Sequence, residues 1–366
     1  MTRPVVHVTG ARPNFPKAAP VVRALAALGV SQLLVHTGQH YDQNMSAVFF
    51  EQLGLPLPDV NLGVGSGSHA AQTAAIMIEL ETLFIRKPPR MVIVYGDVNS
   101  TVAAALVAAK LGIELAHVEA GLRSFDRSMP EEINRIVTDR LCTLLFVTSP
   151  EAIGNLGNEG VDPKIIHFVG NPMIDTLVAN QSSLDASAIR SLLELSGPYV
   201  VATLHRPSNV DDPATIRSLV RELHLVCDQV PVVLPLHPRG RQRLTSAGLL
   251  GHSRLRVVEP MGYVEFISLV SEASAVITDS GGVQEETTML GVPCLTLRHN
   301  TERPVTITDG TNELVRLSDL ARRVEAILGA GRPPTWPTPP LWDGQSGARI
   351  ARIVARHLQE AHGELD

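Results

Sequence analysis

The sequence AVITDSGGVQEE, residues 275–286, decides the fold of this chain. Its first four residues are typical of a buried strand, and the small residues after them are typical of a turn that opens a helix. A helix start leaves backbone N–H groups directed at solvent, which suits an anion such as a diphosphate. Ser280, Gly281 and Gly282 permit close approach of the anion, and Glu285 or Glu286 is positioned to accept hydrogen bonds from sugar hydroxyls. A tight turn without a ligand is the alternative interpretation.

The rest of the chain repeats this strand-then-helix plan, which predicts α/β domains with doubly wound parallel sheets. The first half contains predicted strands at 4–8, 33–37, 91–95, 115–118 and 144–148, with helices over 18–28 and 100–111. The second half contains predicted strands at 199–203, 232–236, 255–258, 275–278 and 294–297. A turn at 170–172 marks a boundary, so we expect an N-terminal Rossmann-like domain over 1–170 and a C-terminal one over 171–345. The proline-heavy stretch 332–340 is expected to be irregular, and 346–366 to form a helix that packs back on the first domain.

Composition supports an ordinary globular protein. Of its residues, 44% are hydrophobic and 19% are charged, as is usual for a globular protein. The length of 366 residues exceeds what one hydrophobic core usually serves, so two domains are expected. A formal net charge of −6 argues against general affinity for nucleic acid or for an anionic membrane. Three widely spaced cysteines, with neither leader-like segment nor long apolar run, indicate a cytoplasmic protein.

Charged residues follow the predicted strands of the first half, where parallel sheets bind ligands. Arg12 and Lys17 come after the first strand, Asp97 after the third and Glu119 after the fourth, while Glu131 lies at a helix start. Acids after neighbouring strands should converge, and their mutual repulsion would raise at least one pKa toward a proton-transfer role. A solvated surface for the cations, and helix capping or dipole compensation for the acids, are the structural alternatives.

In the second half, histidines and arginines recur together at strand ends. His205 precedes Arg206, and His237 lies two residues before Arg239. Such pairs are suited to holding an anion. The glycines of 63–67 lack dinucleotide-binding spacing and predict a loop. A triphosphatase phosphate loop and an Asp-x-Asp metal motif are both absent from the sequence, so neither metal nor any other cofactor is indicated.

Together these motifs resemble those of the bacterial and archaeal non-hydrolysing UDP-N-acetylglucosamine 2-epimerases. The resemblance extends over nearly the whole chain, in order, through residues 10–17, 37–40, 96–97, 118–123, 130–135, 205–206, 279–286 and 301–304. The family often has an acid at the position of Asn14. This chain also differs from the family's commonest sequence at residues 15–16 and 207–208. The resemblance implies a GT-B type fold, with two Rossmann-like domains around a central cleft, usually assembled as a homodimer.

The resemblance also implies a reaction and a set of site residues. UDP-N-acetylglucosamine and UDP-N-acetylmannosamine would interconvert by elimination of UDP and its re-addition, supplying precursors for cell-envelope polysaccharides. Asp97, Glu119 and Glu131 match the family's acids, and His205 joins them as a catalytic candidate. The candidate substrate-binding residues are Arg12, Lys17, Arg135, Phe266, Ser280, Gly281, Gly282, Glu286 and Arg303. Gln39, His40 and His237 are candidates for a regulatory contact, because in some family members the loop matching Gln39 and His40 contacts a second substrate molecule.

Several alternatives remain open from the sequence. A relative using a UDP-2,3-diacetamido uronic acid and a hydrolysing 2-epimerase that releases free N-acetylmannosamine would share most of these motifs. A GT-B glycosyltransferase or a nucleotide-sugar sensor would share the predicted diphosphate-binding turn at residues 279–286. The three acids of the first half favour an epimerase, because a glycosyltransferase needs no proton relay across two faces of a carbon.

Overall fold

The computed structural model describes residues 3–38, 50–236 and 238–363, and it divides the chain into two compact units. Unit 1 comprises residues 1–179 and 340–366, and unit 2 comprises 180–339. The predicted regulatory residues Gln39, His40 and His237 lie outside the described residues. Among the residues that are described, no helix combines the length and apolarity that a membrane span requires.

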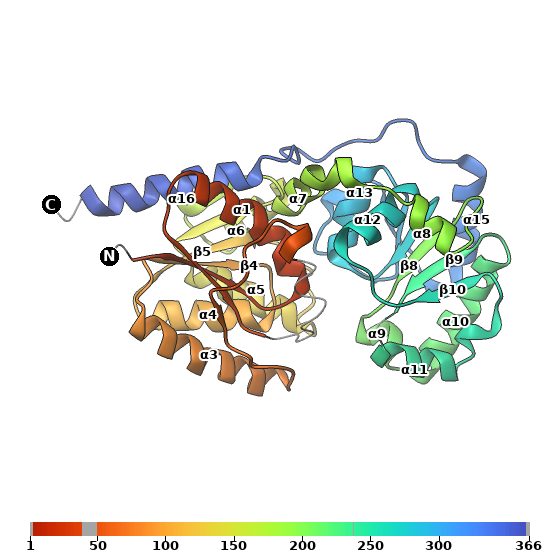
Figure 1. Ribbon diagram of the computed structural model, residues 1–366, viewed down its shortest axis with the longest axis horizontal. Helices are drawn as coiled ribbons and strands as arrows, with labels where there is room; N and C mark the ends of the chain where they lie inside the picture. The colour runs from red at the N-terminus through yellow and green to blue at the C-terminus, as the bar shows by residue number, and fades with distance from the viewer. Residues whose placement is uncertain (1–2, 39–49, 237, 364–366) are drawn as a thin grey trace. The chain divides into compact units, whose positions relative to one another are not determined.

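Unit 1 is built on a seven-stranded sheet in which every described strand pair is parallel (Figure 1). In sheet order its strands are β3 (Val60–Asn61), β2 (Gln32–His36), β1 (Val5–Thr9), β4 (Met91–Tyr95), β5 (Glu114–Ala120), β6 (Leu144–Val147) and β7 (Ile166–Phe168). Its helices are α1 (Phe15–Ala27), α3 (His69–Arg86), α4 (Asn99–Lys110), α5 (Pro130–Leu141), α6 (Pro150–Asn158), α7 (Pro172–Asn180) and α16 (Ser346–Gly363).

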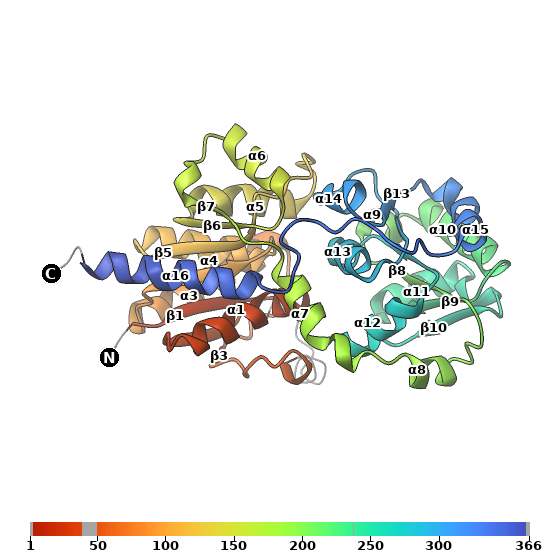
Figure 2. The same ribbon diagram turned by 90° about the horizontal axis from the view of Figure 1, so that it is seen from above.

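Helices cover both faces of this sheet. Helices α1 and α16 lie side by side on one face, and α3 and α4 lie on the other (Figures 1 and 2). Strand residues such as Val92 and Ile93 are completely buried, which explains why these strands are continuous apolar runs without alternation. The C-terminal helix completes the core of unit 1 through Ile350, Val354 and Leu358.

Unit 2 repeats the plan with a six-stranded parallel sheet. In sheet order its strands are β10 (Leu255–Val258), β9 (Val232–Pro235), β8 (Val200–Thr203), β11 (Ala275–Thr278), β12 (Cys294–Thr296) and β13 (Asn312–Leu314). Its helices are α8 (Ser187–Leu192), α9 (Pro207–Val210), α10 (Pro213–Cys227), α11 (Pro238–Ser246), α12 (Tyr263–Glu272), α13 (Gly281–Leu290), α14 (Val305–Thr308) and α15 (Leu320–Ala330). Helices α10 and α15 cover one face, and α12 and α13 the other.

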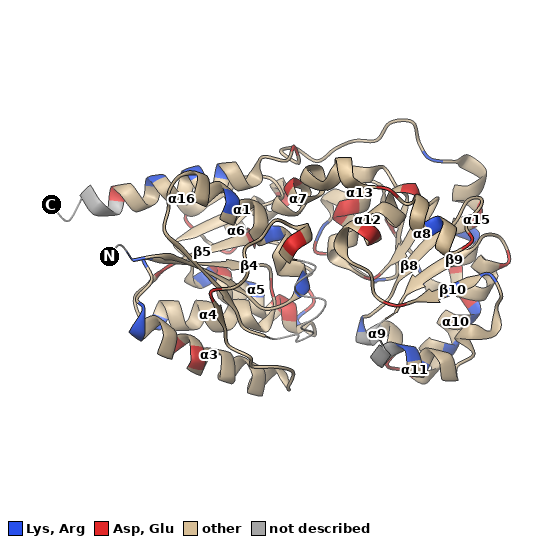
Figure 3. Cartoon of the chain, viewed as in Figure 1, with Lys and Arg blue, Asp and Glu red and all other residues tan. Residues whose placement is uncertain are grey.

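Each strand expected from the sequence is present, and three short ones were missed. Strands β3, β7 and β13 have two or three residues each, too few to show a hydrophobic period. Residues 332–340 lack regular structure, as expected from their prolines. Acidic and basic residues are spread over the elements of each unit (Figure 3).

The structural division follows residue 179, later than the turn at 170 that suggested a boundary. The reason is that α7 is anchored in unit 1: the Thr176 hydroxyl donates to the carbonyl of Pro16 at 2.6 Å. In addition, the Asp175 carboxylate accepts from the backbone N–H groups of Ser346 and Gly347, at 3.0 and 2.7 Å, and so caps α16. The return segment 340–345 likewise belongs to unit 1, where the Trp342 indole donates to the carbonyl of Thr148.

Gly170 provides a test of this anchoring. It has a φ of +81°, and a Cβ there would overlap the carbonyl oxygen of Leu341 in the return segment. The control is Gly160→Ala, because Gly160 has a similar φ of +75° but open space around it. The control should lose about 1–2 kcal/mol of unfolding free energy from backbone strain alone. Gly170→Ala should lose that amount plus about 1–3 kcal/mol for the steric overlap, measured by chemical denaturation. Equal losses in the two variants would contradict the close packing of the return segment.

Candidate active site

Strand order reverses beside β1 in unit 1 and beside β8 in unit 2, and polar residues collect after the strands at both places. In doubly wound sheets the loops at such a reversal diverge and leave room for a ligand. The segment after β1 carries Arg12 in a short 3-10 helix and Lys17 in the first turn of α1, and the turn after the neighbouring β4 carries Asp97. In unit 2, His205 follows β8 and Ser280 follows the neighbouring β11.

Hydrogen bonds hold the strand ends of unit 1 together. The Asn14 amide donates to the carbonyl of Tyr95 at 2.7 Å, and its oxygen accepts from the backbone N–H groups of Gly10 and Ala11. An ionised aspartate at this position could accept both bonds but could not donate the first. Asn14 therefore joins the loop after β1 to the end of β4.

Lys17 and Glu119 form a buried ion pair beside Gly96. Their side chains are 7% and 4% exposed. A Cβ at Gly96 would lie 3.0 Å from Glu119 Oε2 and 3.1 Å from Lys17 Nζ, so glycine is needed for this close approach. Glu119 itself has a φ of +76°, at a register shift between β5 and β6. Such strain in a non-glycine residue is concentrated at functional sites.

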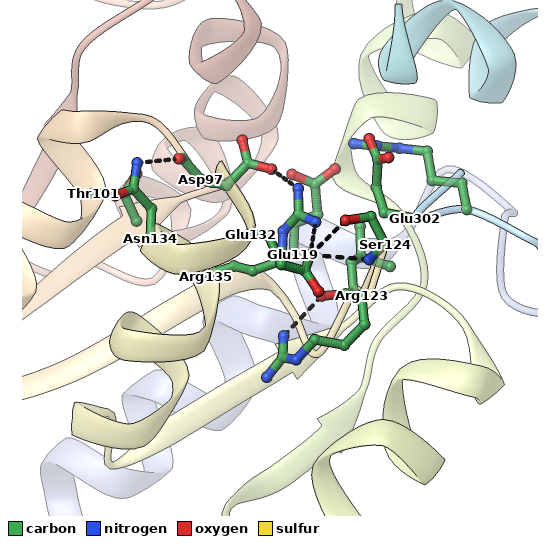
Figure 4. A network of polar contacts seen from close by, with 12 residues as sticks. Asp97, Thr101, Glu119, Arg123, Ser124, Glu132, Asn134, Arg135 and Glu302 are labelled. Carbon is green, nitrogen blue, oxygen red and sulfur yellow. Dashed lines mark hydrogen bonds and ion pairs between the residues drawn. The ribbon is translucent and has the colours of Figure 1, made fainter. Parts of the chain in front are cut away.

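Asp97 lies at one end of a charged network around Arg135 (Figure 4). The guanidinium of Arg135 pairs with Asp97 and, at 2.5 Å, with Glu132. The Asn134 amide donates to the backbone carbonyl of Asp97 at 2.9 Å. Asp97 keeps 26% of its side chain exposed, whereas Arg135 is buried. The candidate substrate-binding residue Arg135 thus contacts a candidate acid directly.

Two of the candidate acids have cationic partners that the sequence did not indicate. Mutual repulsion was expected to raise a pKa, but the structure gives Asp97 and Glu119 each a cationic partner from another element. A nearby cation stabilises the charged form of a carboxyl group and so acts in the opposite direction. The cation beside each acid therefore opposes the effect expected from repulsion between the acids.

Glu131 and its neighbour Glu132 have different roles. Glu132 is 1% exposed and accepts hydrogen bonds from the backbone N–H groups of Ser124 and Phe125 and from the Ser124 hydroxyl, all at 2.9 Å. Glu131, half-buried in the first turn of α5, has no polar partner within the part of the chain that the structure describes. The structural residue of the pair is Glu132, which sequence reasoning missed, although an acid three residues before Arg135 on a helix was a usable signal.

In unit 2, a buried carboxylate orients His205. Asp279 is 0% exposed and accepts from His205 Nδ1 at 2.8 Å, from the backbone N–H groups of His205 and Arg206, and from the Asn209 amide. Burial alone would raise the pKa of Asp279, but the hydrogen bond and charge of His205 and the other donors outweigh it and lower the pKa. The His205 side chain is 65% exposed, so its other ring nitrogen is accessible.

The start of α13 combines a helix terminus with a buried guanidinium. Arg303 is 5% exposed and pairs with Glu302 and, at 2.9 Å, with Glu285. A Cβ at Gly281 would overlap its guanidinium. The sequence attributed Gly281 to the approach of an anion, and the structure shows that this glycine also makes room for Arg303.

The remaining candidates lie around this helix start. Ser280 is the half-buried N-cap residue of α13, followed by Gly281 and Gly282 in its first turn. Glu286 is 3% exposed and lies near Tyr263, whose pKa is raised by its burial and by the charge of this carboxylate. Phe266 is partly buried against the core of unit 2 and does not contribute a polar group. Arg12, half-buried, begins the short 3-10 helix Arg12–Asn14.

Comparison with known proteins identifies the family. A sequence profile described as UDP-N-acetylglucosamine 2-epimerase matches residues 23–355. The chain belongs to this epimerase family. The UDP-N-acetylglucosamine 2-epimerase of Methanocaldococcus jannaschii is 40% identical over 359 residues, which cover 95% of this chain and 97% of that protein. The UDP-2,3-diacetamido-2,3-dideoxy-D-glucuronate 2-epimerase of Pseudomonas aeruginosa is 40% identical over 356 residues, 96% of this chain and 99% of that protein.

Solved structures confirm the fold of this epimerase family member. The crystal structure of the M. jannaschii UDP-GlcNAc 2-epimerase in complex with UDP-GlcNAc and UDP has a TM-score of 0.89 and 40% identity, covering 96% of this chain and 99% of that one. The predicted GT-B type fold, with two Rossmann-like units, is confirmed. Among the described residues, no group of three or more histidine, cysteine, aspartate or glutamate side chains is arranged to hold a metal ion.

The different environments of Glu131 and Glu132 give a stability prediction. Glu132→Gln should lower the free energy of unfolding by about 3 kcal/mol, because it leaves the buried Arg135 charge without one of its partners. Glu131→Gln should change it by less than about 0.5 kcal/mol, because that carboxylate holds no described element together. Chemical denaturation of both variants measures the difference. Equal stabilities would contradict the structural role of Glu132.

Proposed function

We propose that this protein interconverts UDP-N-acetylglucosamine and UDP-N-acetylmannosamine by inverting the configuration at C2 of the sugar. The main support for the proposal is that one chain of the epimerase family contains both a cluster of acids and a candidate diphosphate-binding helix start. Unit 1 places acids and cations at its strand-order reversal, and unit 2 places a helix N-terminus with His205 at the corresponding point. Acids can move a proton, and the helix start can hold a diphosphate.

The chemistry explains why both kinds of site are needed. No carbonyl group lies next to C2 of the sugar, so a carboxylate cannot remove the C2 proton directly at a useful rate. When UDP leaves C1, positive charge develops on the ring and acidifies the C2–H bond. Loss of the proton gives a glucal-type intermediate and free UDP. Re-addition of UDP at C1, with the proton delivered to the opposite face of C2, completes the inversion.

Each step is assigned to residues described above. Arg12, Lys17, His205 and the start of α13 stabilise the negative charge that grows on the departing diphosphate, a type of contact worth roughly 2.7–4 kcal/mol per donor in an oxyanion site. Arg303 and Glu286 hold the uridine and ribose end. Asp97, Glu119 and Glu131 carry the proton from and to C2, for which general acid–base catalysis contributes on the order of 10²–10⁴ in rate.

Glu131 is the acid best suited to accept a proton, because its protonation would not break an ion pair of the site. Asp97 and Glu119 are ion-paired, so protonating either of them would weaken a contact with Arg135 or Lys17. Release of Lys17 toward the diphosphate would free the Glu119 carboxylate at the moment when substrate binds. This exchange of partners couples substrate binding to activation of an acid.

A second candidate substrate is a UDP-2,3-diacetamido-2,3-dideoxy uronic acid. It is favoured by the 40% identity to the P. aeruginosa epimerase named for that sugar, which equals the identity to the M. jannaschii epimerase. Parallel assays with both UDP-sugars would decide between them. A product assay for free N-acetylmannosamine would separate epimerisation from hydrolysis.

Deuterium exchange at C2 tests the reaction. In heavy water the protein should incorporate deuterium at C2 of UDP-N-acetylglucosamine, detected by NMR as loss of the C2–H signal. Asp97→Asn and Glu131→Gln should each lower the exchange rate by at least about 100-fold, because each removes a proton carrier. The dissociation constant for UDP, measured by calorimetry, should change by less than about threefold, since neither substitution removes a residue proposed to bind the diphosphate. Exchange at the normal rate in both variants would reject the assignment of the acids.

We also propose that the protein is a cytoplasmic homodimer. Its three cysteines are free and buried, as suits a reducing compartment. Helix α3 carries an exposed apolar stripe in which Ile78 and Ile85 are each 63% exposed and Ala71 lies seven residues before Ile78. Residues seven apart share one helix face, so this stripe is suited to covering the same stripe of a second copy.

Sedimentation velocity tests the dimer. Replacing Ile78 and Ile85 together by glutamate should shift the protein from dimer to monomer, because the added carboxylates of both copies would be buried against one another at the interface. The control is Leu192→Glu, a single exposed leucine on α8 that is 81% exposed and outside the stripe. A monomeric wild-type protein, or a dimer unaffected by the double substitution, would contradict the proposed interface.

A further inference from the structure

A histidine in the middle of the unit 1 sheet is bonded through both ring nitrogens. His117, on β5, is 0% exposed. Its Nδ1 lies 2.6 Å from Asp139 Oδ1, and its Nε2 lies 2.8 Å from the backbone carbonyl oxygen of Gly96. A carboxylate and a backbone carbonyl can only accept hydrogen bonds. Both nitrogens of His117 must therefore donate, which requires the doubly protonated imidazolium.

The surrounding charges balance when His117 is an imidazolium. Asp139 is shared between His117 and Arg123, whose guanidinium lies 2.7 Å from Asp139 Oδ2, and Arg123 in turn binds Glu159 at 2.7 and 2.9 Å. Two cations and two anions thus form one connected group. Burial alone would raise the pKa of Asp139, but the hydrogen bond and charges of His117 and Arg123 lower it. The other titratable group beside Asp139 is Cys142, whose thiol stays protonated because burial raises its pKa.

A second buried histidine in the same sheet shows the opposite arrangement. His7, on β1, bonds the Tyr95 hydroxyl through Nδ1 at 2.7 Å and Gln32 Oε1 through Nε2 at 2.8 Å. The tyrosine can donate to Nδ1 while Nε2 donates to the glutamine, so the neutral ring satisfies both contacts. Burial lowers the pKa of His7 to about 4, against the opposing effect of the Gln32 bond. Equal burial of two histidines therefore does not decide their charge, whereas their partners do.

The backbone carbonyl that accepts from His117 belongs to Gly96, which lies next to the candidate acids Asp97 and Glu119. Gly96 has a φ of +65°, precedes Asp97, and lies in close contact with Lys17 and Glu119. Its backbone N–H donates to the carbonyl of Val118 at 3.0 Å. The Gly96–Asp97 turn is thereby fixed on both sides by β5, through Val118 and through the ring of His117.

We propose that His117 is a positioning residue for the epimerase reaction: an imidazolium that donates to both Asp139 and the Gly96 carbonyl, and so holds the turn carrying Asp97. This inference rests on the proposed function for its effect on the reaction, whereas the charge of His117 follows from the contacts alone. His117 acts through Gly96 and Asp139 and does not itself exchange a proton with substrate. Its positive charge beneath the turn also offsets the negative charges of Asp97 and Glu119.

NMR of the full-length protein tests the charge without any substrate. With ¹⁵N-labelled histidine, the signals of His117, assigned by their absence in His117→Gln, should show both ring nitrogens protonated, because both face hydrogen-bond acceptors. His7 should show a single protonated nitrogen in the same spectrum. In Asp139→Asn, His117 should become singly protonated because its counter-ion is gone. A singly protonated His117 in the wild-type protein would overturn the proposal.

Kinetics test the positioning role against a matched control. His117→Gln can donate to Gly96 or to Asp139 but not to both, and it should lower kcat for C2 deuterium exchange by at least about tenfold with KM within about twofold. His7→Gln removes a comparable buried histidine of the same sheet and should leave kcat within about twofold. Equal kcat losses in the two variants, or an unchanged kcat in His117→Gln, would overturn the positioning role. Absence of exchange in the wild-type protein would instead reject the proposed function, while the NMR spectrum would still decide the charge of His117.

Discussion

The reversal of strand order beside β1 and beside β8 is the constraint on which the rest of the structure depends. In a parallel sheet every strand ends at the same edge, so residues distant in sequence meet there once the order is set. Lys17 follows β1 and Glu119 ends β5, yet the two form one buried ion pair. In unit 2, the same rule brings Asp279, after β11, under His205, after β8.

Charge compensation is the second constraint, because a buried charge without a partner costs several kcal/mol. Arg135 satisfies Asp97 and Glu132, Arg303 satisfies Glu285 and Glu302, and Asp139 lies between two cations. These ion pairs give each buried carboxylate a cationic partner and connect loops that are distant in sequence. A diphosphate that takes over one of the cations would change the protonation behaviour of the acid left behind, which links binding to chemistry.

Much of this was predictable because it depends on local patterns. Long apolar runs identified the main strands, and acids or cations directly after them identified Asp97, Glu119, Lys17 and His205 as site candidates. The short strands carry too few residues for any period to be visible. His117 was also missed, although a histidine within a buried strand is a signal, since it must find polar partners. The anchoring of α7 escaped prediction because it rests on contacts of Asp175 with the distant Ser346 and Gly347.

By itself, the sequence determined the α/β class, the repeat of one plan in two units and the positions of the motifs, because these follow from hydrophobic period, glycine and proline placement and the order of residues along the chain. Tertiary structure alone decided which polar groups meet. Glu132 binds the loop at Ser124 and Phe125, whereas Glu131 does not, and Gly281 makes room for Arg303. His117 and His7 have different hydrogen-bond partners although both are buried. The physical reason is that the charge and availability of a polar group are set by its partners in space, and strand order and packing choose those partners.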